Sequence, residues 1–209
     1  MKFNNKLAIE LGLDTQEILL FKKLNTISKI QDFLVKMPSN LEHDGESIKS
    51  VRESLKRNRA HCIEGALISA LALWLHGEKP LILDLNANGD DDHVITLFKI
   101  NNHWGAISKA NRPQLRYRDP IYRNLHELTI SYFHEYLNER GERRLVSYSR
   151  PFNLKSTKIN WVTSEDDLWE LDKILTNIKH YSILPKNRNF NTRKADPIEL
   201  KSLELREFK

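Results

Sequence analysis

The sequence predicts an α+β fold, in which helices precede a β-hairpin. The clearest helix covers residues 62–76, an Ala- and Leu-rich stretch that ends at Gly77. Residues 93–100 and 104–109 read as the two strands of a hairpin. They flank Asn101 and Asn102, a pair that tolerates the positive φ of a tight turn. Mixed helical and hairpin patterns of this kind are typical of α+β folds.

Helices are also expected before this region. Asp14, followed three residues later by Glu17, has the spacing of a capping box and predicts a helix start. A second helix is expected over residues 27–35, where apolar residues recur at helical spacing, and a polar helical turn over residues 47–58. These segments lead the chain into the helix at residues 62–76.

Further elements follow along the chain. Short strands are expected at residues 81–83, 115–118 and 144–148, with a helix over residues 124–137. Another helix is expected from Ser164 to about Ile178, with Asp167 placed to cap it. The chain has 209 residues and no internal repeat, which favours one domain over residues 1–185, followed by a polar, loose C-terminal tail over residues 186–209.

Composition excludes several classes of protein. Apolar residues make up 40% and charged residues 29% of the chain, and no apolar run approaches the roughly 18 residues of a membrane-spanning helix. A single cysteine permits no intrachain disulfide, no redox pair and no cysteine-rich zinc site. Nothing at the N-terminus has the pattern of a signal peptide. We therefore expect a cytoplasmic protein that does not enter the membrane.

One feature of the helix at residues 62–76 predicts chemistry. Its only cysteine, Cys62, lies in the first turn, where the helix dipole favours a negative charge. A nearby imidazolium lowers the pKa of a thiol further, and His93 at the start of the first hairpin strand is the candidate. Asp119, after the strand expected at 115–118, is the carboxylate that we expect to orient His93.

The neighbouring polar residues have lesser predicted roles. His61 adjoins Cys62 in sequence, but adjacent helical residues diverge by about 100°, so we interpret His61 as a packing or capping residue. The backbone N–H of Cys62 is the natural first donor of an oxyanion hole, and Asn58 is a side-chain candidate close in sequence. The small residues of the helix form one side that can approach another layer closely: Cys62, Gly65, Ala66, Ser69 and Ala70.

The order of these residues resembles the transglutaminase-like branch of the papain-like cysteine hydrolases. The segments that carry the resemblance, to a group of uncharacterised bacterial proteins of that superfamily, lie between about residues 30 and 154 and read AHCIEGALISA, DDHVITLFK, WGAISKAN, LRYRDPIY and SYFHEYLN. The resemblance implies a papain-like core, with the Cys-bearing helix packed on an antiparallel sheet, and a catalytic triad of Cys62, His93 and Asp119. The separation of His93 and Asp119 is longer than the family usually shows, so Asn111 and, more weakly, Asp92 are alternatives for the third member.

The resemblance implies a cysteine hydrolase or acyltransferase that acts on an amide or ester bond of a peptide or protein. Its thioester intermediate is resolved by water in a protease or amidase and by an amine in a transglutaminase. No cofactor and no metal ion are expected. The loop after Asp84 resembles the opening of a calcium loop, but position twelve is Ile95, where calcium loops require a bidentate Glu.

The alternative is a non-catalytic binding module of the same fold that uses a basic face for a protein or nucleic-acid partner. The net charge is +5, and residues 99–150 carry the whole excess of basic residues. A groove for phosphates is one interpretation of this segment and an ordinary solvated face is the other, which makes nucleic acid the less favoured partner. The basic side chains in question are Lys109, Arg112, Arg116, Arg118 and Arg123.

Overall fold

The computed structural model describes residues 2–43, 45–89, 92–185 and 192–208. Within these ranges the strands form one seven-stranded antiparallel sheet, in the order β4-β3-β2-β1-β5-β7, with β6 paired to the other end of β1. The strands are β1 (Leu81–Ala87), β2 (His93–Ile100), β3 (His103–Ile107), β4 (Arg118–Tyr122), β5 (Leu145–Ser149), β6 (Phe152–Asn153) and β7 (His180–Ser182). The mixed α+β fold with an antiparallel sheet is thus confirmed.

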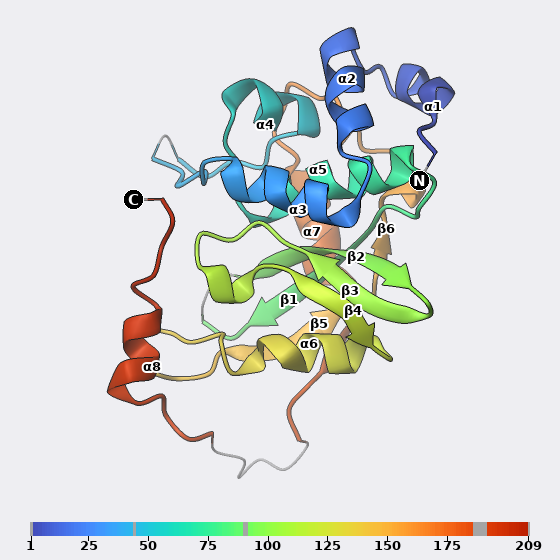
Figure 1. Cartoon of the computed structure of the whole chain (residues 1–209). Helices are drawn as coiled ribbons and strands as arrows, with labels where there is room; N and C mark the ends of the chain where they lie inside the picture. Colours follow the sequence, from blue (N-terminus) through green and yellow to red (C-terminus); the bar gives the residue numbers. More distant parts are fainter. Residues whose placement is uncertain (1, 44, 90–91, 186–191, 209) are drawn as a thin grey trace.

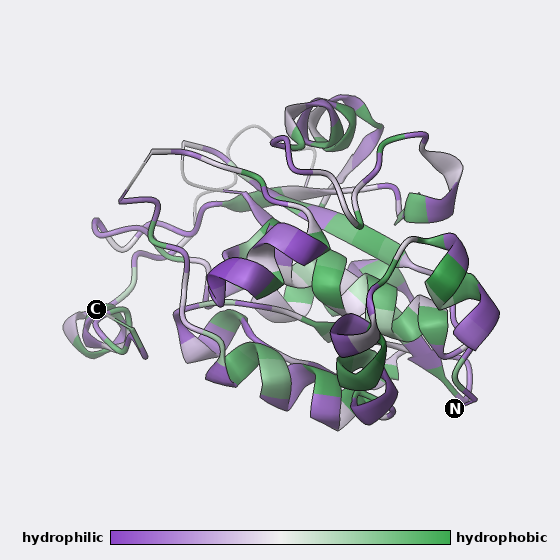
Figure 2. Cartoon of the chain, turned by 90° about the horizontal axis from the view of Figure 1, so that it is seen from above, coloured by the Kyte–Doolittle hydropathy of each residue, from purple (hydrophilic) through white to green (hydrophobic). Residues whose placement is uncertain are grey.

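Helices cover both faces of this sheet (Figure 1). One side carries α1 (Asn5–Glu10), α2 (Thr15–Lys23), α3 (Ile27–Lys36), α4 (Val51–Arg57), α5 (Cys62–Leu75) and α7 (Trp169–Asn177), and the other carries α6 (Leu125–Phe133). The chain also forms the short turns η1 (Pro113–Leu115) and η2 (Leu154–Ser156) and the C-terminal helix α8 (Pro197–Ser202). The outer helices carry bands of hydrophilic and hydrophobic residues, as expected for amphipathic helices that cover a core (Figure 2).

The sheet separates two hydrophobic cores because successive residues of a strand point to opposite faces. Val94 and Phe98 of β2 belong to the core beneath α5, whereas Ile95 and Leu97 belong to the core beneath α6. Helix α5 runs through the first core, and its residues from Ile63 to Leu73 are all buried. The Cys-bearing helix is therefore the central helix of the molecule.

The small side of α5 approaches the sheet as the sequence predicts. The Ser69 hydroxyl lies 2.7 Å from the Thr96 hydroxyl, which in turn donates to the carbonyl of Ala66 at 2.8 Å. A Cβ added at Gly65 would lie 2.3 Å from Cβ of Lys109, so only glycine allows this approach. The close packing fixes the start of α5 against the edge of β2 and the segment after β3.

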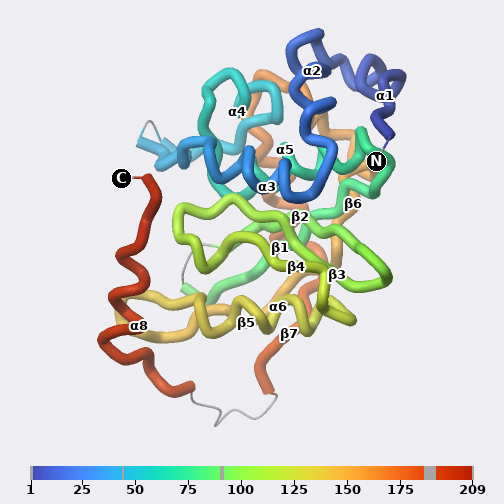
Figure 3. The backbone as a smooth tube through the Cα atoms, viewed as in Figure 1, coloured from blue at the N-terminus to red at the C-terminus, as the bar shows by residue number. Residues whose placement is uncertain are grey.

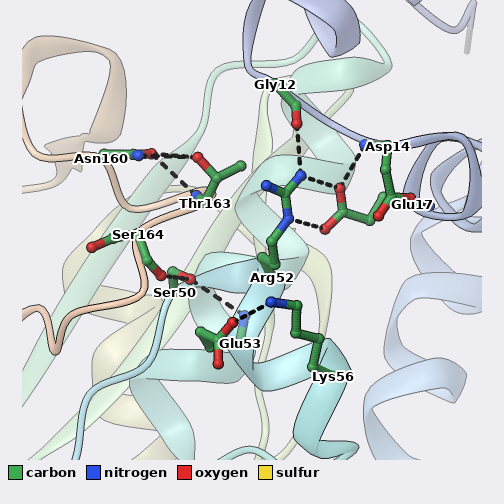
Figure 4. A network of polar contacts seen from close by, with 10 residues as sticks. All are labelled: Gly12, Asp14, Glu17, Ser50, Arg52, Glu53, Lys56, Asn160, Thr163 and Ser164. Atoms are coloured by element: carbon green, nitrogen blue, oxygen red, sulfur yellow. Dashed lines mark hydrogen bonds and ion pairs between the residues drawn. The ribbon is translucent and has the colours of Figure 1, made fainter.

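The N-terminal helices are held to this centre by a network around Arg52 of α4 (Figure 4). Its guanidinium donates to both carboxylate oxygens of Glu17, at 2.9 and 2.7 Å, and to the carbonyl of Gly12 at 2.6 Å. Glu17 also accepts from the N–H of Asp14, and Asp14 from the N–H of Glu17, which confirms the predicted capping box. One arginine thus joins α4 to the start of α2.

Several predicted boundaries agree with the structure. Helix α3 and helix α4 occupy the expected segments, and Asn101 and Asn102 adopt positive φ values of 48° and 65° at the turn between β2 and β3. Strand β5 lies one residue from its expected place. These elements depend on local periodicity and on caps, which the sequence displays directly.

Three expectations are wrong. The strand expected at residues 115–118 is replaced by η1 and by β4, which begins at Arg118, because Pro113 opens a helical turn. Helix α7 begins at Trp169 and not near Ser164. The reason is that Asp167 accepts from the N–H of Ile48 at 3.0 Å and pairs with Lys49 at 2.7 Å, so it does not cap the helix.

The third wrong expectation is that of a loose C-terminal tail. Residues 192–208 are ordered, while residues 186–191 and 209 lie outside the described residues. Helix α8 begins with a capping box of Asp196 and Glu199. Arg143 holds the helix by an ion pair to Glu199 at 3.0 Å, and the Gln114 amide donates to the carbonyl of Ser202 at 2.8 Å. The tail therefore lies against the body of the protein.

Candidate active site

Cys62 is the first residue of α5, and the chain before it is firmly held. Ala60 forms a parallel bridge with Ser39, and its N–H donates to the carbonyl of Pro38 at 3.0 Å. The buried carboxylate of Glu64 accepts from the N–H of His61 at 2.9 Å and from the N–H of Lys49 at 3.0 Å. These bonds fix the backbone before Cys62 and with it the direction in which the Cys62 side chain points from the start of α5.

Two imidazoles lie at the sulfur of Cys62. Burial by itself raises the pKa of this thiol, but hydrogen bonds with His61 and His93 and the charges of both rings outweigh it and lower the pKa to about 5. As a residue Cys62 is intermediate in exposure, and its Sγ lies 3.9 Å from the carbonyl oxygen of Asp92. A thiol with a depressed pKa is largely thiolate at neutral pH, and the thiolate is the nucleophilic form of cysteine.

His93 is buried at the start of β2 and is oriented by neutral groups. Its Nε2 lies 2.6 Å from Oγ of Ser108 and 3.3 Å from the carbonyl oxygen of Leu115. Because a carbonyl only accepts, Nε2 is the donor in its contact with Leu115. The backbone of Ser108 is itself held by Gln31, which accepts from its N–H and donates to its carbonyl, each at 3.0 Å.

His61 lies closer to the sulfur of Cys62 than the sequence predicts. Burial by itself lowers the pKa of His61, but the hydrogen bond to Cys62 and the negative charges of Cys62 and Glu64 raise it to about 9. Its Nε2 donates to the carbonyl of Ser47 at 2.7 Å. The expectation that adjacent residues point apart fails because His61 is the N-cap, with extended backbone angles, and so precedes the helical geometry on which that expectation rests.

Asp119 does not lie beside His93. It is exposed on β4, and the registers of β3 with β2 and β4 place it level with Phe98, five residues along β2 from His93. At about 3.4 Å per residue this is a separation of about 17 Å along the strand direction. The displacement follows from the antiparallel pairing of β4 with β3: β4 begins with Arg118 opposite Ala106 and runs away from the end of the sheet where His93 begins β2.

The two alternatives for the third member are engaged elsewhere. The side chain of Asn111 bonds the backbone of Phe208 twice, as donor and acceptor, at 2.8 Å each. The carboxylate of Asp92 accepts from the N–H of Ala87 at 2.7 Å and from the amide of Asn86 at 3.1 Å. Both residues line cavities at Cys62, but the groups that contact Nε2 of His93 are Ser108 and Leu115.

Cys62 opens into two cavities. The first has a volume of about 370 Å³ and is lined by His61, His93 and three cationic side chains, which are Lys109, Arg112 and Arg206. The second, of about 270 Å³, shares Cys62, His61 and Asp92 with the first. Its acidic residues are Glu42, Glu46, Asp84, Asp92 and Asp172. Cys62 therefore lies where a cavity with three cationic side chains meets a cavity with five acidic ones.

The candidate donors of an oxyanion hole differ in position. Cys62 is the first helical residue, so its backbone N–H has no acceptor within the helix and is available to a developing oxyanion. Asn58 is exposed at the C-cap of α4 with a φ of 49° and lines neither cavity at Cys62. Asn40 does line the first cavity, but its amide donates to Ser47 and Glu64, each at 3.3 Å.

The basic segment is largely neutralised within the molecule. Arg118 pairs with Glu135, and Arg116 with Glu207. Lys109 is buried, and its ammonium donates to the carbonyl of Met37. Arg112 and Arg123 have partners too, the carbonyl of Leu137 and the carboxylate of Glu127. These contacts weaken the case for a basic docking face.

The loop with a calcium-like opening has structural roles. Asp84 is buried, and its carboxylate lies 3.0 Å from Nε2 of His180; burial raises its pKa to about 6 although His180 acts in the opposite direction. Asp92 bonds the loop backbone, as described above. Within the described part of the chain, no three His, Cys, Asp or Glu side chains gather as a metal site would require. Nor is any described helix long and apolar enough to cross a bilayer.

Sequence reasoning missed Glu64 and Ser108 and gave His61 only a packing or capping role. The capping-box spacing of His61 and Glu64 was readable, but histidine is not among the usual N-cap residues. The turn at Asn101 and Asn102 also fixes the hairpin register, which places Ser108 near the start of β2. Comparison with known proteins adds no further guide: the sequence matches no protein-family model and no curated protein.

Proposed function

We propose that the protein is a cysteine hydrolase or acyltransferase in which Cys62 is the nucleophile and His93 the acid and base. The observation that carries the proposal is the pKa of Cys62, lowered to about 5 by two imidazoles at a helix start that opens into two cavities. Strongly perturbed pKa values in a cleft are typical of catalytic groups. A structural thiol is instead buried in apolar surroundings with a raised pKa.

The proposed first stage forms a thioester. The thiolate of Cys62 attacks the carbonyl carbon of an amide or ester, and the N–H of Cys62 stabilises the oxyanion of the tetrahedral intermediate. The protonated His93 gives its proton to the leaving nitrogen or oxygen as the bond to the carbonyl carbon breaks. The acyl group remains on the sulfur, and His93 is left neutral.

The second stage restores the thiolate. His93 removes a proton from water or from an amine, which attacks the thioester carbonyl, and the carbon–sulfur bond breaks. Water yields a carboxylic acid and an amine yields a new amide. In this proposal Ser108 and the carbonyl of Leu115 hold the ring of His93, a role for which the transglutaminase-like resemblance implied Asp119.

The proposal includes the papain-like architecture, a peptide or protein substrate and, from the single cysteine, a cytoplasmic location. The antiparallel sheet with the Cys-bearing helix packed against it supports the architecture. The cavities on both sides of the sulfur support an extended substrate. Because the charges of residues 109–123 have partners within the chain, nucleic acid is a poor fit.

The test uses the only thiol of the chain. The rate of alkylation by iodoacetamide, followed by intact mass from pH 4 to 9, should rise with a midpoint near pH 5. His93→Ala should slow the reaction at pH 6, and mixing the parent with an activated ester should give an acyl-protein that Cys62→Ser does not form. Slow alkylation that is indifferent to His93, with no acyl-protein, would contradict the proposal and favour the binding module.

A further inference from the structure

The C-terminal segment of the chain reaches the candidate active site. It rises from α8 along one side of the molecule towards the level of α3 (Figure 3). Arg206 lines the same cavity of about 370 Å³ as Cys62 and His93. A part of the chain far from Cys62 in sequence therefore occupies space beside the nucleophile.

The backbone of the segment is held there by Asn111. The side-chain amide of Asn111 donates to the carbonyl of Phe208, and its oxygen accepts from the N–H of Phe208, each at 2.8 Å. The carbonyl of Asn111 accepts from the N–H of Glu207 at 3.2 Å. Hydrogen bonds to the main chain of a peptide hold it whatever its side chains are.

Two further contacts involve the side chains of Glu207 and Phe208. The guanidinium of Arg116 pairs with the carboxylate of Glu207. The ammonium of Lys109 lies 4.8 Å from the ring centroid of Phe208, within the range of a cation–π contact. Lys109 is 2% exposed and Arg116 also donates to the carbonyl of Ala110 at 2.8 Å, so both cations are fixed by their surroundings. Together they select an acidic residue followed by an aromatic one.

We propose that Lys109, Asn111 and Arg116 form a peptide-binding subsite for an extended acidic–aromatic segment, and that residues 206–208 occupy this subsite in competition with substrate. The proposal deepens the proposed function and rests on it for the identity of the bound peptide as substrate. Because α8 is held against the body of the protein, residues 206–208 stay close to the subsite. Its effective concentration is consequently high, and the subsite stays filled until the tail is displaced.

The first experiment measures binding to the full chain without any chemistry. A fluorescein-labelled peptide with the sequence of residues 203–208, LELREF, is titrated against the parent and against Phe208→Ala by fluorescence anisotropy. Phe208→Ala removes the ring that contacts Lys109 and so weakens the binding of residues 206–208 to the subsite. The variant should therefore bind the peptide at least tenfold more tightly than the parent. Leu205→Ala, a change at a 60% exposed residue of the same segment, should bind like the parent.

Specificity provides the second arm. Adding Asn111→Ala or Arg116→Ala to Phe208→Ala should reduce peptide binding at least tenfold, and the peptide LELRFE, with the last two residues exchanged, should bind equally poorly. The proposal would be overturned if the parent and Phe208→Ala bound LELREF equally well. It would also be overturned if Phe208→Ala bound LELREF and LELRFE equally well.

The two proposals can fail separately. Peptide binding does not need the thiol, so it is repeated in Phe208→Ala with Cys62→Ser, where the same affinity is expected. If alkylation shows an ordinary thiol while the peptide still binds, the catalytic proposal is lost and the subsite remains. If the thiol is activated but the peptide result is negative, only the subsite is lost.

Discussion

Nε2 of His93 lies 2.6 Å from Oγ of Ser108, a neutral hydroxyl, in the place where a carboxylate was expected. A hydroxyl both accepts and donates, so it holds the ring of His93 without adding a charge beside it. The thiolate of Cys62 and the imidazoles of His61 and His93 supply the charges of the site. The following predictions depend on this arrangement and on the packing around it.

Ser108→Ala should reduce the activation of Cys62. Loss of one hydrogen bond, worth about 1 kcal/mol, lets the ring of His93 turn and should lower the alkylation rate at pH 6 about fivefold. Asp119→Ala should leave the rate within about twofold of the parent, because that side chain is exposed and distant from His93. Intact mass spectrometry measures both rates, and an equal loss in the two variants would restore Asp119 to the site.

His61→Ala should move the pH profile of alkylation upwards. The imidazolium of His61 stabilises the thiolate, so its removal raises the pKa of Cys62 from about 5 towards the ordinary value of 9. The thiolate fraction near pH 6 then falls, and with it the rate, by about tenfold for a rise of two units. His103→Ala, at the first residue of β3 and the far end of the hairpin from His93, is the matched control and should leave the midpoint unchanged. A midpoint that stays near 5 in His61→Ala would assign the activation to His93 alone.

Gly65→Ala should destabilise the fold. The new Cβ would lie 2.3 Å from Cβ of Lys109 and would push α5 away from the segment after β3, at a cost of about 1–3 kcal/mol in the free energy of unfolding. Adding Lys109→Gly removes the side-chain atoms that clash with the new Cβ. The double variant should therefore lose less free energy of unfolding than the sum of the losses of the two single variants. Urea unfolding followed by circular dichroism measures this coupling, and strict additivity would contradict the contact.

Arg52→Ala should loosen the attachment of α2. Its removal leaves the carboxylate of Glu17, which is 9% exposed, without its cationic partner, and should lower the free energy of unfolding by about 2–3 kcal/mol. Lys56→Ala breaks the exposed pair with Glu53 in the same helix and should have no measurable effect. Thermal unfolding of both variants compares them, and equal losses would place the stabilising role of Arg52 in doubt.

The sequence by itself determined the elements whose signals are local. The capping box of Asp14 and Glu17, the small side of α5 and the turn at Asn101 and Asn102 are written in residue type and spacing. From them followed the placement of Cys62 at a helix start and of His93 at a strand start. Helix caps and tight turns involve neighbours within a few residues, so no tertiary information is needed.

Only the tertiary structure decided what surrounds the sulfur. Ser108 lies at His93 in place of Asp119 because β4 pairs with β3 from Arg118 onwards and runs away from the end of the sheet where His93 begins β2. The C-terminal segment reaches Asn111 across nearly half the chain, and such a contact has no periodicity to display. Non-local pairs depend on how whole elements pack, and that information is absent from any short stretch of sequence.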